Sequence, residues 1–412
     1  MVKCNMKKPL LIILLLCTIT ALGWLAVFSW NNLRGIRPAL KNPPQDIARL
    51  IESVKAGANT TDMPLTLSPG FSISIFAKGL GSPRVMTLDP ADTLLVSVPS
   101  QGRVVALPDE DQDGTADRIV TVIDGLRRPH GLAFRCAPDC RLYIAEENQV
   151  NMYSYDQKNR KAVKLKKIAA LPSGGGHATR TLLFLPKPYD DQLLISVGSS
   201  CNVCNEDDWR RAKVLVVPVD GGDLKTFASG LRNAVFMSIY PKSGKVWATE
   251  MGRDLLGDDL PPDEINIIEQ DRDYGWPFCY GKNVHDTDFD PGRKKICKEP
   301  GTYPSHINVP AHSAPLGLSF FPEEGWPEEF RNDLLVAYHG SWNRSIPTGY
   351  KIVRYRLSST GEYQKVEDFV TGWLTKDGSA IGRPVDVMVR PRGTIFVSDD
   401  KAGVIYRISR NR

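Results

Sequence analysis

The feature that most constrains the fold is a repeat, which we count six times along the chain. Each copy has a polar lead-in, a short apolar strand, a turn and a second apolar strand, and a third strand often follows. The lead-ins with their first strands are residues 79–88, 125–134, 177–184, 230–239, 312–320 and 382–388. A four-stranded sheet cannot cover both of its own faces, so sheets of this kind stack radially around a channel. The repeat predicts an all-β, six-bladed β-propeller and disfavours an open β-sandwich.

The repeat also sets the predicted domain limits. Residues 67–412 should form the propeller, and residues 71–76 should close the ring by pairing with the last blade, which removes a free sheet edge. Residues 31–66 are predicted to be a linker. Within this linker, residues 43–56 show a short helical pattern that places four apolar side chains on one face: Ile47, Leu50, Ile51 and Val54.

The N-terminus, residues 1–30, predicts a membrane anchor. Three lysines, Lys3, Lys7 and Lys8, precede an uncharged apolar run over residues 9–30, and about 20 apolar residues span a bilayer as a helix. The positive flank predicts a cytoplasmic N-terminus, which places a single-pass protein in the inner membrane with its propeller facing the periplasm. A cleaved signal peptide is the alternative, because the most apolar part of the run is short.

Cysteine usage agrees with export. Six cysteines fall into three close pairs, and proximity in the sequence favours the disulfides Cys136–Cys140, Cys201–Cys204 and Cys279–Cys297. The alternative for the second pair is half of a zinc site, but the chain has no second CxxC and no histidine pair with finger spacing. The net charge of +5 over 412 residues is too small to indicate nucleic-acid binding.

Polar lead-ins predict a functional site, because the innermost strands of a propeller begin near its axis. Three of the six histidines occupy equivalent positions in the repeat. The lead-in residues expected at one mouth of the channel are Arg84, His130, His177, Arg180, Arg232, Asn233, His312 and Arg383. A polar, partly cationic funnel that holds a possible base is the hypothesis they support. For His130 and His312, a plain loop role is an equal alternative.

With these motifs, the chain resembles the family of soluble quinoprotein glucose/sorbosone dehydrogenases, which depend on pyrroloquinoline quinone, and especially its sorbosone dehydrogenase branch. The resemblance covers about residues 68–410. An ordered series of short motifs carries it: 176–182, 230–233, 250–254, 262–266, 274–277, 339–344 and 382–387.

The resemblance implies a catalytic pair at the funnel. His177 matches the general base that takes the proton of a sugar hydroxyl while hydride leaves the carbon for the quinone, and a neutral imidazole suits this task. Arg232 matches the arginine beside the reacting carbonyl, where a fixed cation stabilises developing negative charge. Asn233 matches a residue that hydrogen-bonds the cofactor.

The resemblance also implies calcium and clamps for the carboxylates of the cofactor. Gly252 and Arg253 match positions whose backbone carbonyls hold Ca²⁺, a cation that prefers oxygen ligands. Arg383 and Arg344 would face the carboxylates. Two departures are notable, because the glucose-oxidising branch has an arginine where this chain has Val385 and a glutamine where it has Val235. That branch also has a lysine near the fifth blade with no firm match here.

An acidic segment after the third strand of the first repeat suggests a second calcium site. Its carboxylates alternate along the chain and a glycine follows: Asp109, Asp111, Asp113 and Asp117. The pattern is not an EF-hand, because Val120 stands where a twelfth-position acid is required. A solvated acidic turn is the alternative.

From the sequence alone, three functions compete. The first is an enzyme that oxidises an aldose sugar or sugar aldehyde and passes electrons to an acceptor, a quinone or a cytochrome. The second is a non-catalytic propeller that binds a ligand or a protein. The third, a metal-dependent lactonase on a similar propeller, needs several acidic or amide side chains at the inner strand starts, where we expect arginine and histidine.

Overall fold

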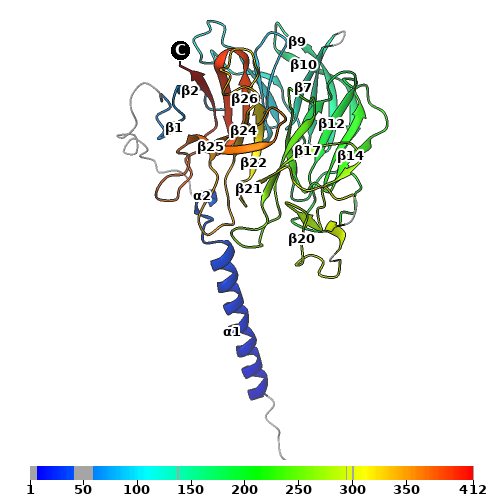
Figure 1. Cartoon of the computed structure of the whole chain (residues 1–412), viewed down its shortest axis with the longest axis vertical. Helices are drawn as coiled ribbons and strands as arrows, with labels where there is room; N and C mark the ends of the chain where they lie inside the picture. The colour runs from blue at the N-terminus through cyan, green and yellow to red at the C-terminus, as the bar shows by residue number, and fades with distance from the viewer. Residues whose placement is uncertain (1–6, 41–58, 137–138, 294, 299–300, 412) are drawn as a thin grey trace, which may run out of the picture.

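The structure is a computed structural model, and it describes residues 7–40, 59–136, 139–293, 295–298 and 301–411. The first helix, α1 (Lys7–Asn32), runs away from a propeller made of strands, as Figure 1 shows. A short helix, α2 (Arg37–Leu40), lies where α1 meets the propeller. The span Ile12–Asn32 has a mean hydropathy of 2.3 and is long and apolar enough to cross a membrane. A signal sequence near the N-terminus has the same properties.

Six sheets form the blades predicted from the repeat, and each runs from an innermost to an outermost strand. Blade 1 contains β3 (Met86–Leu88), β4 (Leu94–Val98), β5 (Arg103–Leu107) and β6 (Val120–Ile123). Blade 2 contains β7 (Leu132–Cys136), β8 (Cys140–Glu146), β9 (Gln149–Asp156) and β10 (Lys161–Ala170). Blade 3 contains β11 (Leu182–Phe184), β12 (Gln192–Val197), β13 (Lys213–Pro218) and β14 (Lys225–Ser229), with β18 (Arg272–Asp273) on its outer edge.

The remaining blades follow the same order. Blade 4 contains β15 (Ala234–Ile239), β16 (Val246–Glu250), β17 (Asp263–Ile268) and β21 (Ile307–Val309). Blade 5 contains β22 (Pro315–Phe320), β23 (Leu334–Tyr338), β24 (Lys351–Leu357) and β25 (Tyr363–Thr371). Blade 6 contains β26 (Pro384–Arg390), β27 (Thr394–Asp399) and β28 (Val404–Arg410). A small hairpin, β19 (Cys279–Tyr280) with β20 (Val284–His285), projects from blade 4.

The ring closes as predicted. Strand β2 (Phe71–Ala77) pairs antiparallel with β28 and completes blade 6, so the two ends of the propeller sequence share one sheet. The predicted linker contributes an element that the sequence pattern did not reveal: β1 (Thr66–Leu67) pairs with β25 on the outer edge of blade 5. The helix predicted for residues 43–56 lies outside the described residues.

Stacking of the blades explains why the second strands are almost wholly apolar. Every residue of β4, β16 and β23 is buried, because each of these strands has a neighbouring blade on both faces. Val235 and Val385, at the two positions where the resemblance leads one to expect polar cofactor contacts, are 1% and 0% exposed and belong to this core. The two valines that replace the expected polar residues therefore add apolar side chains to the core.

All three predicted disulfides are confirmed. Cys136–Cys140 closes the β7–β8 hairpin, Cys201–Cys204 lies in the loop between β12 and β13, and Cys279–Cys297 ties the small hairpin of blade 4. The second pair is thus a disulfide and not half of a zinc site.

Candidate functional site

Polar side chains from several blades meet at the end of the propeller where the innermost strands begin. We call this end the site face. It comprises the segments that lead into β3, β7, β11, β15, β22 and β26, together with the loops that follow the second strands. Contacts across blade boundaries join these segments: the ring of His130 contacts the carbonyl of Arg180, and Arg84 of blade 1 pairs with Asp400 of blade 6.

His177 lies half-buried on the site face and is held through one ring nitrogen. Its Nδ1 is 2.9 Å from Ser199 Oγ and 3.0 Å from the Ser199 carbonyl oxygen. Within the part of the chain that the structure describes, its Nε2 has no hydrogen-bond partner. Burial, together with the nearby guanidinium of Arg232, lowers the pKa of His177 to about 3, so the imidazole is neutral at pH 7.

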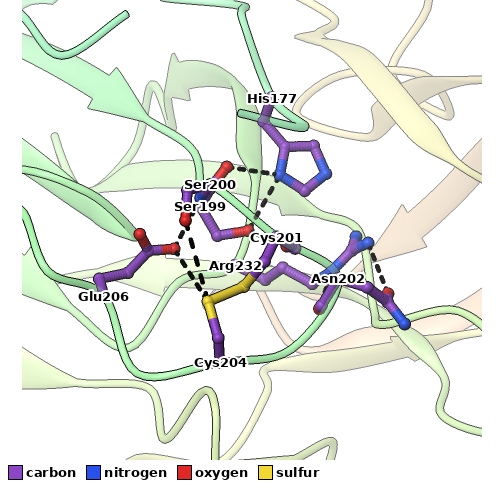
Figure 2. The surroundings of a disulfide bond; sticks show 8 residues. All are labelled: His177, Ser199, Ser200, Cys201, Asn202, Cys204, Glu206 and Arg232. Carbon is purple, nitrogen blue, oxygen red and sulfur yellow. Dashed lines mark hydrogen bonds between the residues drawn. A yellow bond between two sulfur atoms is a disulfide. The ribbon is translucent and has the colours of Figure 1, made fainter. Parts of the chain in front are cut away.

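Arg232 is fixed by the loop that carries the Cys201–Cys204 disulfide, as Figure 2 shows. Asn202, between the two cysteines, accepts from Arg232 Nε through its carbonyl oxygen at 2.9 Å and from a terminal nitrogen through Oδ1 at 3.0 Å. Asp254 accepts from the same nitrogen at 3.1 Å. The first cysteine also contributes, because Ser199 Oγ, which contacts His177, donates to the Cys201 carbonyl at 2.7 Å. One disulfide loop therefore positions both predicted catalytic residues.

Asn233 lies close to His177 across a glycine. A Cβ on Gly198 would come within 2.5 Å of Asn233 Oδ1 and 2.7 Å of His177 Cβ, so only glycine lets these side chains approach each other here. The backbone N–H of Asn233 donates to Glu250 at 2.8 Å. The structure therefore brings together three of the predicted residues, His177, Arg232 and Asn233, from blades 3 and 4.

Two further arginines give this side of the site face a surplus of positive charge. Arg180 is 0% exposed and donates only to backbone carbonyls, among them that of His177 at 2.9 Å. Arg211 is 6% exposed and donates to the carbonyls of Ser173 and Gly174, while its NH1 is buried with no partner in the described residues. Neither forms an ion pair within those residues. Burial lowers the pKa of Arg180 to about 10, with Arg211 contributing. Because buried charges usually have partners, this arrangement suits a bound anion.

Arg383 lies on the opposite side of the site face, in blade 6. Its side chain donates to the carbonyls of His339 at 3.0 Å and Gly340 at 2.6 Å, and it lies 5.5 Å from the centroid of the Tyr350 ring. His339 Nε2 is 2.9 Å from Asp400, which also accepts from Arg84 at 2.6 Å. Burial, aided by Arg383, lowers the pKa of His339 to about 4. Burial tends to raise the pKa of Asp400, but its contacts with His339 and Arg84 outweigh burial and lower that pKa.

The residues predicted to hold calcium at the site lie beside Arg232. Gly252 donates its N–H to Asp263 at 2.9 Å, and the Arg253 side chain pairs with Asp286 at 2.8 Å. Neither backbone carbonyl oxygen accepts a hydrogen bond within the described residues. Backbone carbonyl oxygens are common ligands of Ca²⁺, so these two free oxygens fit a calcium site.

Arg344 contacts an exposed aspartate, Asp259. Its guanidinium donates to Asp259 at 2.9 Å and to the Ala311 carbonyl at 3.3 Å. This arginine is thus engaged at the rim between blades 4 and 5, and its contact with Asp259 competes with the predicted role as a carboxylate clamp. His130 and His312 are both buried, and His312 Nε2 is 2.7 Å from the Gly257 carbonyl, so the structure favours structural roles for them.

Sequence reasoning missed a set of buried acids on this face. The last residue of the second strand is acidic in three blades, and its carboxylate accepts the N–H of a lead-in residue: Glu146 from Arg127 at 2.6 Å, Glu250 from Asn233 at 2.8 Å and Asp399 from Arg383 at 2.8 Å. Burial raises the pKa of Glu250, and it raises that of Asp399 to about 6. The recurrence of an acid at the end of the second strand was the signal in the sequence.

The predicted second calcium site lies between β5 and β6. The carboxylate oxygens of Asp109, Asp111 and Asp113 lie within 4.8 Å of one another, whereas Asp117 accepts the N–H of Glu110 at 2.7 Å. Burial raises the pKa of Asp109, and repulsion from its two acidic neighbours adds to the rise. In the described residues, the other group with metal-ligand spacing contains Cys201, Cys204 and Glu206, where both cysteines are oxidised.

Comparisons with known proteins agree with this architecture. The family model described as TrAA12-like matches residues 65–411. An uncharacterised protein of Borreliella burgdorferi is 30% identical over 371 residues, which cover 87% of this chain and 94% of that protein. The pyrroloquinoline quinone-dependent pyranose dehydrogenase of Coprinopsis cinerea is 24% identical over 86% of this chain, and the match spans 56% of that longer protein.

Solved structures of low identity share the fold. Iodide and calcium structures of the Trichoderma reesei carbohydrate-active enzyme of family AA12 superpose with TM-scores of 0.73 and 0.72, both at 21% identity. They cover 87% and 85% of this chain and 100% of their own chains. The holo form of the quinone domain of the Coprinopsis cinerea dehydrogenase superposes with a TM-score of 0.71 at 22% identity, covering 86% of this chain and 99% of that one.

Proposed function

The chain belongs to the TrAA12-like family, and from this premise we propose that it is a quinoprotein oxidoreductase that oxidises an aldose sugar or a sugar aldehyde. The observation that carries the proposal is the state of His177. This imidazole is kept neutral by burial and by Arg232, is held through Nδ1, and keeps Nε2 without a partner in the described residues. Neutrality at pH 7, a fixed orientation and one free ring nitrogen are three conditions that a general base has to meet.

In this proposal, His177 Nε2 accepts the proton of the sugar hydroxyl. Ser199 fixes the ring through Nδ1, so the basic nitrogen points in one direction. Arg232 supplies a fixed positive charge for the oxygen on which negative charge develops, and Asn202 and Asp254 hold it so that it does not reorganise during the reaction. Pyrroloquinoline quinone, when bound, would accept the hydride.

The residues on the site face fit this cofactor. Arg180 and Arg211 are buried cations without ion pairs among the described residues, and Arg383 adds a guanidinium on the other side, so an anion with several carboxylates has cationic partners on both sides. Asn233 offers an amide beside His177. The carbonyl oxygens of Gly252 and Arg253 are the proposed calcium ligands. The names of the Coprinopsis and Trichoderma relatives, with their quinone and calcium forms, support both assignments.

The substrate and the acceptor complete the proposal. A sorbosone-like sugar aldehyde is the finer substrate class we propose, and a quinone or a cytochrome would take the electrons. A non-catalytic binding propeller is the second candidate, favoured by Val235 and Val385, which place core side chains where polar contacts were expected. The lactonase hypothesis gains no support, because the acids at the ends of the second strands accept backbone N–H groups.

A titration tests the proposal. Full-length protein would be mixed with pyrroloquinoline quinone and Ca²⁺ while the absorbance of the quinone is followed, and turnover of a panel of aldoses and sugar aldehydes would be measured with an artificial electron acceptor. We expect saturable binding at micromolar quinone and oxidation of at least one sugar. Absence of binding at that concentration would refute the enzyme and favour the binding propeller.

A further inference from the structure

The chain that leaves α1 packs directly on the site face. A side chain at Gly35 would run into the backbone carbonyl of Arg344, so the connector after α1 lies in contact with the β23–β24 loop. Arg34 lies 3.8 Å from Asp258 in the β16–β17 loop. Lys401, in the β27–β28 loop, contacts the carbonyl of Pro38 at 3.4 Å.

Each of these three loops also builds the candidate site. The β23–β24 loop begins with His339 and Gly340, whose carbonyls accept from Arg383. The β16–β17 loop contains Asp254, which holds Arg232, and the β27–β28 loop contains Asp400. The apolar helix therefore leaves the propeller from the face that carries the site, and Figure 1 shows α1 extending from that end.

The distance between this face and the end of the apolar span is short. Within the span Ile12–Asn32, an apolar stretch of 18 residues has no residue buried by the protein. Trp30 near the end of the span is 65% exposed, and the guanidinium of Arg34 lies 4.7 Å from the centroid of its ring. Tryptophan is enriched at membrane–water interfaces. Trp30 lies about 3 Å along the axis from the last residue of α1, Asn32, at 1.5 Å per residue, and Gly35 follows in the turn after the helix.

The same loops expose large apolar side chains next to the anchor. Ile346 is 74% exposed and Trp342 38% exposed in the β23–β24 loop, and Leu260 is 49% exposed in the β16–β17 loop. Ser345, next to Ile346, donates its N–H to Asp258 at 2.8 Å, so the two loops touch each other beside Arg34. Exposed apolar side chains grouped around the exit of an apolar helix indicate a surface that meets lipid.

We propose that the site face rests on the surface of the bilayer that holds α1, with Ile346, Trp342 and Leu260 inserted at the membrane–water interface. The candidate site then opens toward the membrane. Under the proposed function, on which this last step alone rests, substrate and electron acceptor reach the site at that interface. The proposal requires that α1 stays attached to the mature protein, and it is independent of whether the propeller catalyses a reaction.

Site-directed spin labelling of the full chain in phosphatidylcholine–phosphatidylglycerol vesicles tests the proposal. Cys4→Ser and Cys17→Ser leave the disulfide cysteines, and one label is then placed by Ile346→Cys or, separately, by Leu260→Cys. The control, Tyr189→Cys, is 64% exposed in the β11–β12 turn at the opposite end of the blade. We expect labels at 346 and 260 to be reached by oxygen from the lipid and shielded from a water-soluble nickel chelate, and the control label to show the reverse.

Two results would overturn the proposal. Labels at both 346 and 260 could be as accessible to the nickel chelate as the control, which would place the site face in water. Alternatively, the mature protein could be recovered from the soluble fraction with an N-terminus that begins beyond α1. Neither result depends on turnover, so a failure of this proposal and a failure of the proposed enzyme activity can be told apart.

Discussion

The two sides of the site face balance their positive charge in different ways. On the side of blades 3 and 4, Arg180 and Arg211 donate to backbone carbonyls and form no ion pair within the described residues. On the side of blades 5, 6 and 1, Arg84 pairs with Asp400, which also contacts His339. Beside His177, Arg180 and Arg211 add positive charge without an ion pair among the described residues, whereas the ring of His339 shares Asp400 with Arg84. Arg383, which is also on the His339 side, donates to backbone carbonyls.

This difference shows that two histidines with similarly lowered pKa values, His177 and His339, can have different roles. Burial is the main cause of the lowered pKa for both, and an arginine adds to it in each case. His339 Nε2 is occupied by a carboxylate, so the ring links two blades. The ring of His177 is held through its other nitrogen, which leaves Nε2 for chemistry. Catalysis is therefore predicted beside His177 alone, whereas arginines on both sides are predicted to anchor the anion.

The largest expected effect separates the two histidines. His177→Ala should lower kcat by about 10²- to 10⁴-fold, the usual contribution of a general base, and leave quinone affinity nearly unchanged. His339→Ala should weaken quinone binding and reduce kcat less, because it releases the carbonyl-bearing loop that holds Arg383. Single-turnover kinetics and quinone titrations measure the two quantities. Loss of the same quantity in both variants would contradict the division between the two sides.

The next effect concerns the arginines of blades 5 and 6. Arg383→Gln should weaken quinone binding by about 10- to 150-fold, since a hydrogen bond to a charged group contributes about 1.5–3 kcal/mol. Arg344→Gln is the matched control, because this guanidinium is engaged with Asp259 at the rim, and it should change affinity by less than about threefold. A larger loss in Arg344→Gln than in Arg383→Gln would restore Arg344 as a clamp and remove Arg383 from the site.

How much of this could be predicted from the sequence depended on the kind of signal. The sixfold repeat and the closing strand were predictable, because the alternation of apolar strands with turns is local and repeated. Short cysteine spacings predicted the disulfides for the same reason. The pairing of β1 with β25 was not predictable, since a two-residue strand has no periodicity to detect.

For the site, the sequence indicated which residues lead into the inner strands but not their partners. Arg211 comes from the loop after the second strand of blade 3 and has no equivalent position in the repeat, so its place near His177 depends on the path of that loop. The ion pair between Arg344 and Asp259 likewise depends on the paths of the two loops that carry these residues. Long-range contacts made by irregular loops determine these details, and no local pattern encodes them.

The disulfide of blade 3 gives the third prediction. Cys201→Ser combined with Cys204→Ser should lower kcat by about 10- to 100-fold, because Asn202 and Ser199 would no longer fix Arg232 and His177, and displacements of about 1 Å are costly for catalysis. The matched control is Cys136→Ser combined with Cys140→Ser in the β7–β8 hairpin, which should leave kcat unchanged. Circular dichroism checks that both variants fold. Equal losses of activity would mean that the disulfides act through stability alone.

A smaller effect should appear in the pH profile. His177 has a pKa of about 3, so it stays neutral and able to accept a proton as the pH falls well below 6.5. Arg211→Gln removes a positive charge that disfavours protonated His177. The pKa of His177 should therefore rise in this variant, and the acid limb of the kcat/KM profile should move to higher pH. Arg210→Gln is the control, because Arg210 is paired with Asp208 at 2.6 Å. An unchanged acid limb in Arg211→Gln would show that Arg211 does not act on the base.

The smallest effect is expected far from both sides of the site face, at the acidic loop of blade 1. Asp109, Asp111 and Asp113 bring carboxylates close together, and burial with mutual repulsion raises the pKa of Asp109, so a bound Ca²⁺ would relieve that repulsion. Two of the three acids are exposed, so the gain should be small: about 1 kcal/mol, or a rise in Tm of about 2–4 °C on adding calcium. Asp111→Asn with Asp113→Asn should abolish the rise without changing kcat, whereas loss of activity in this variant would tie the loop to the site and contradict its separation from both sides.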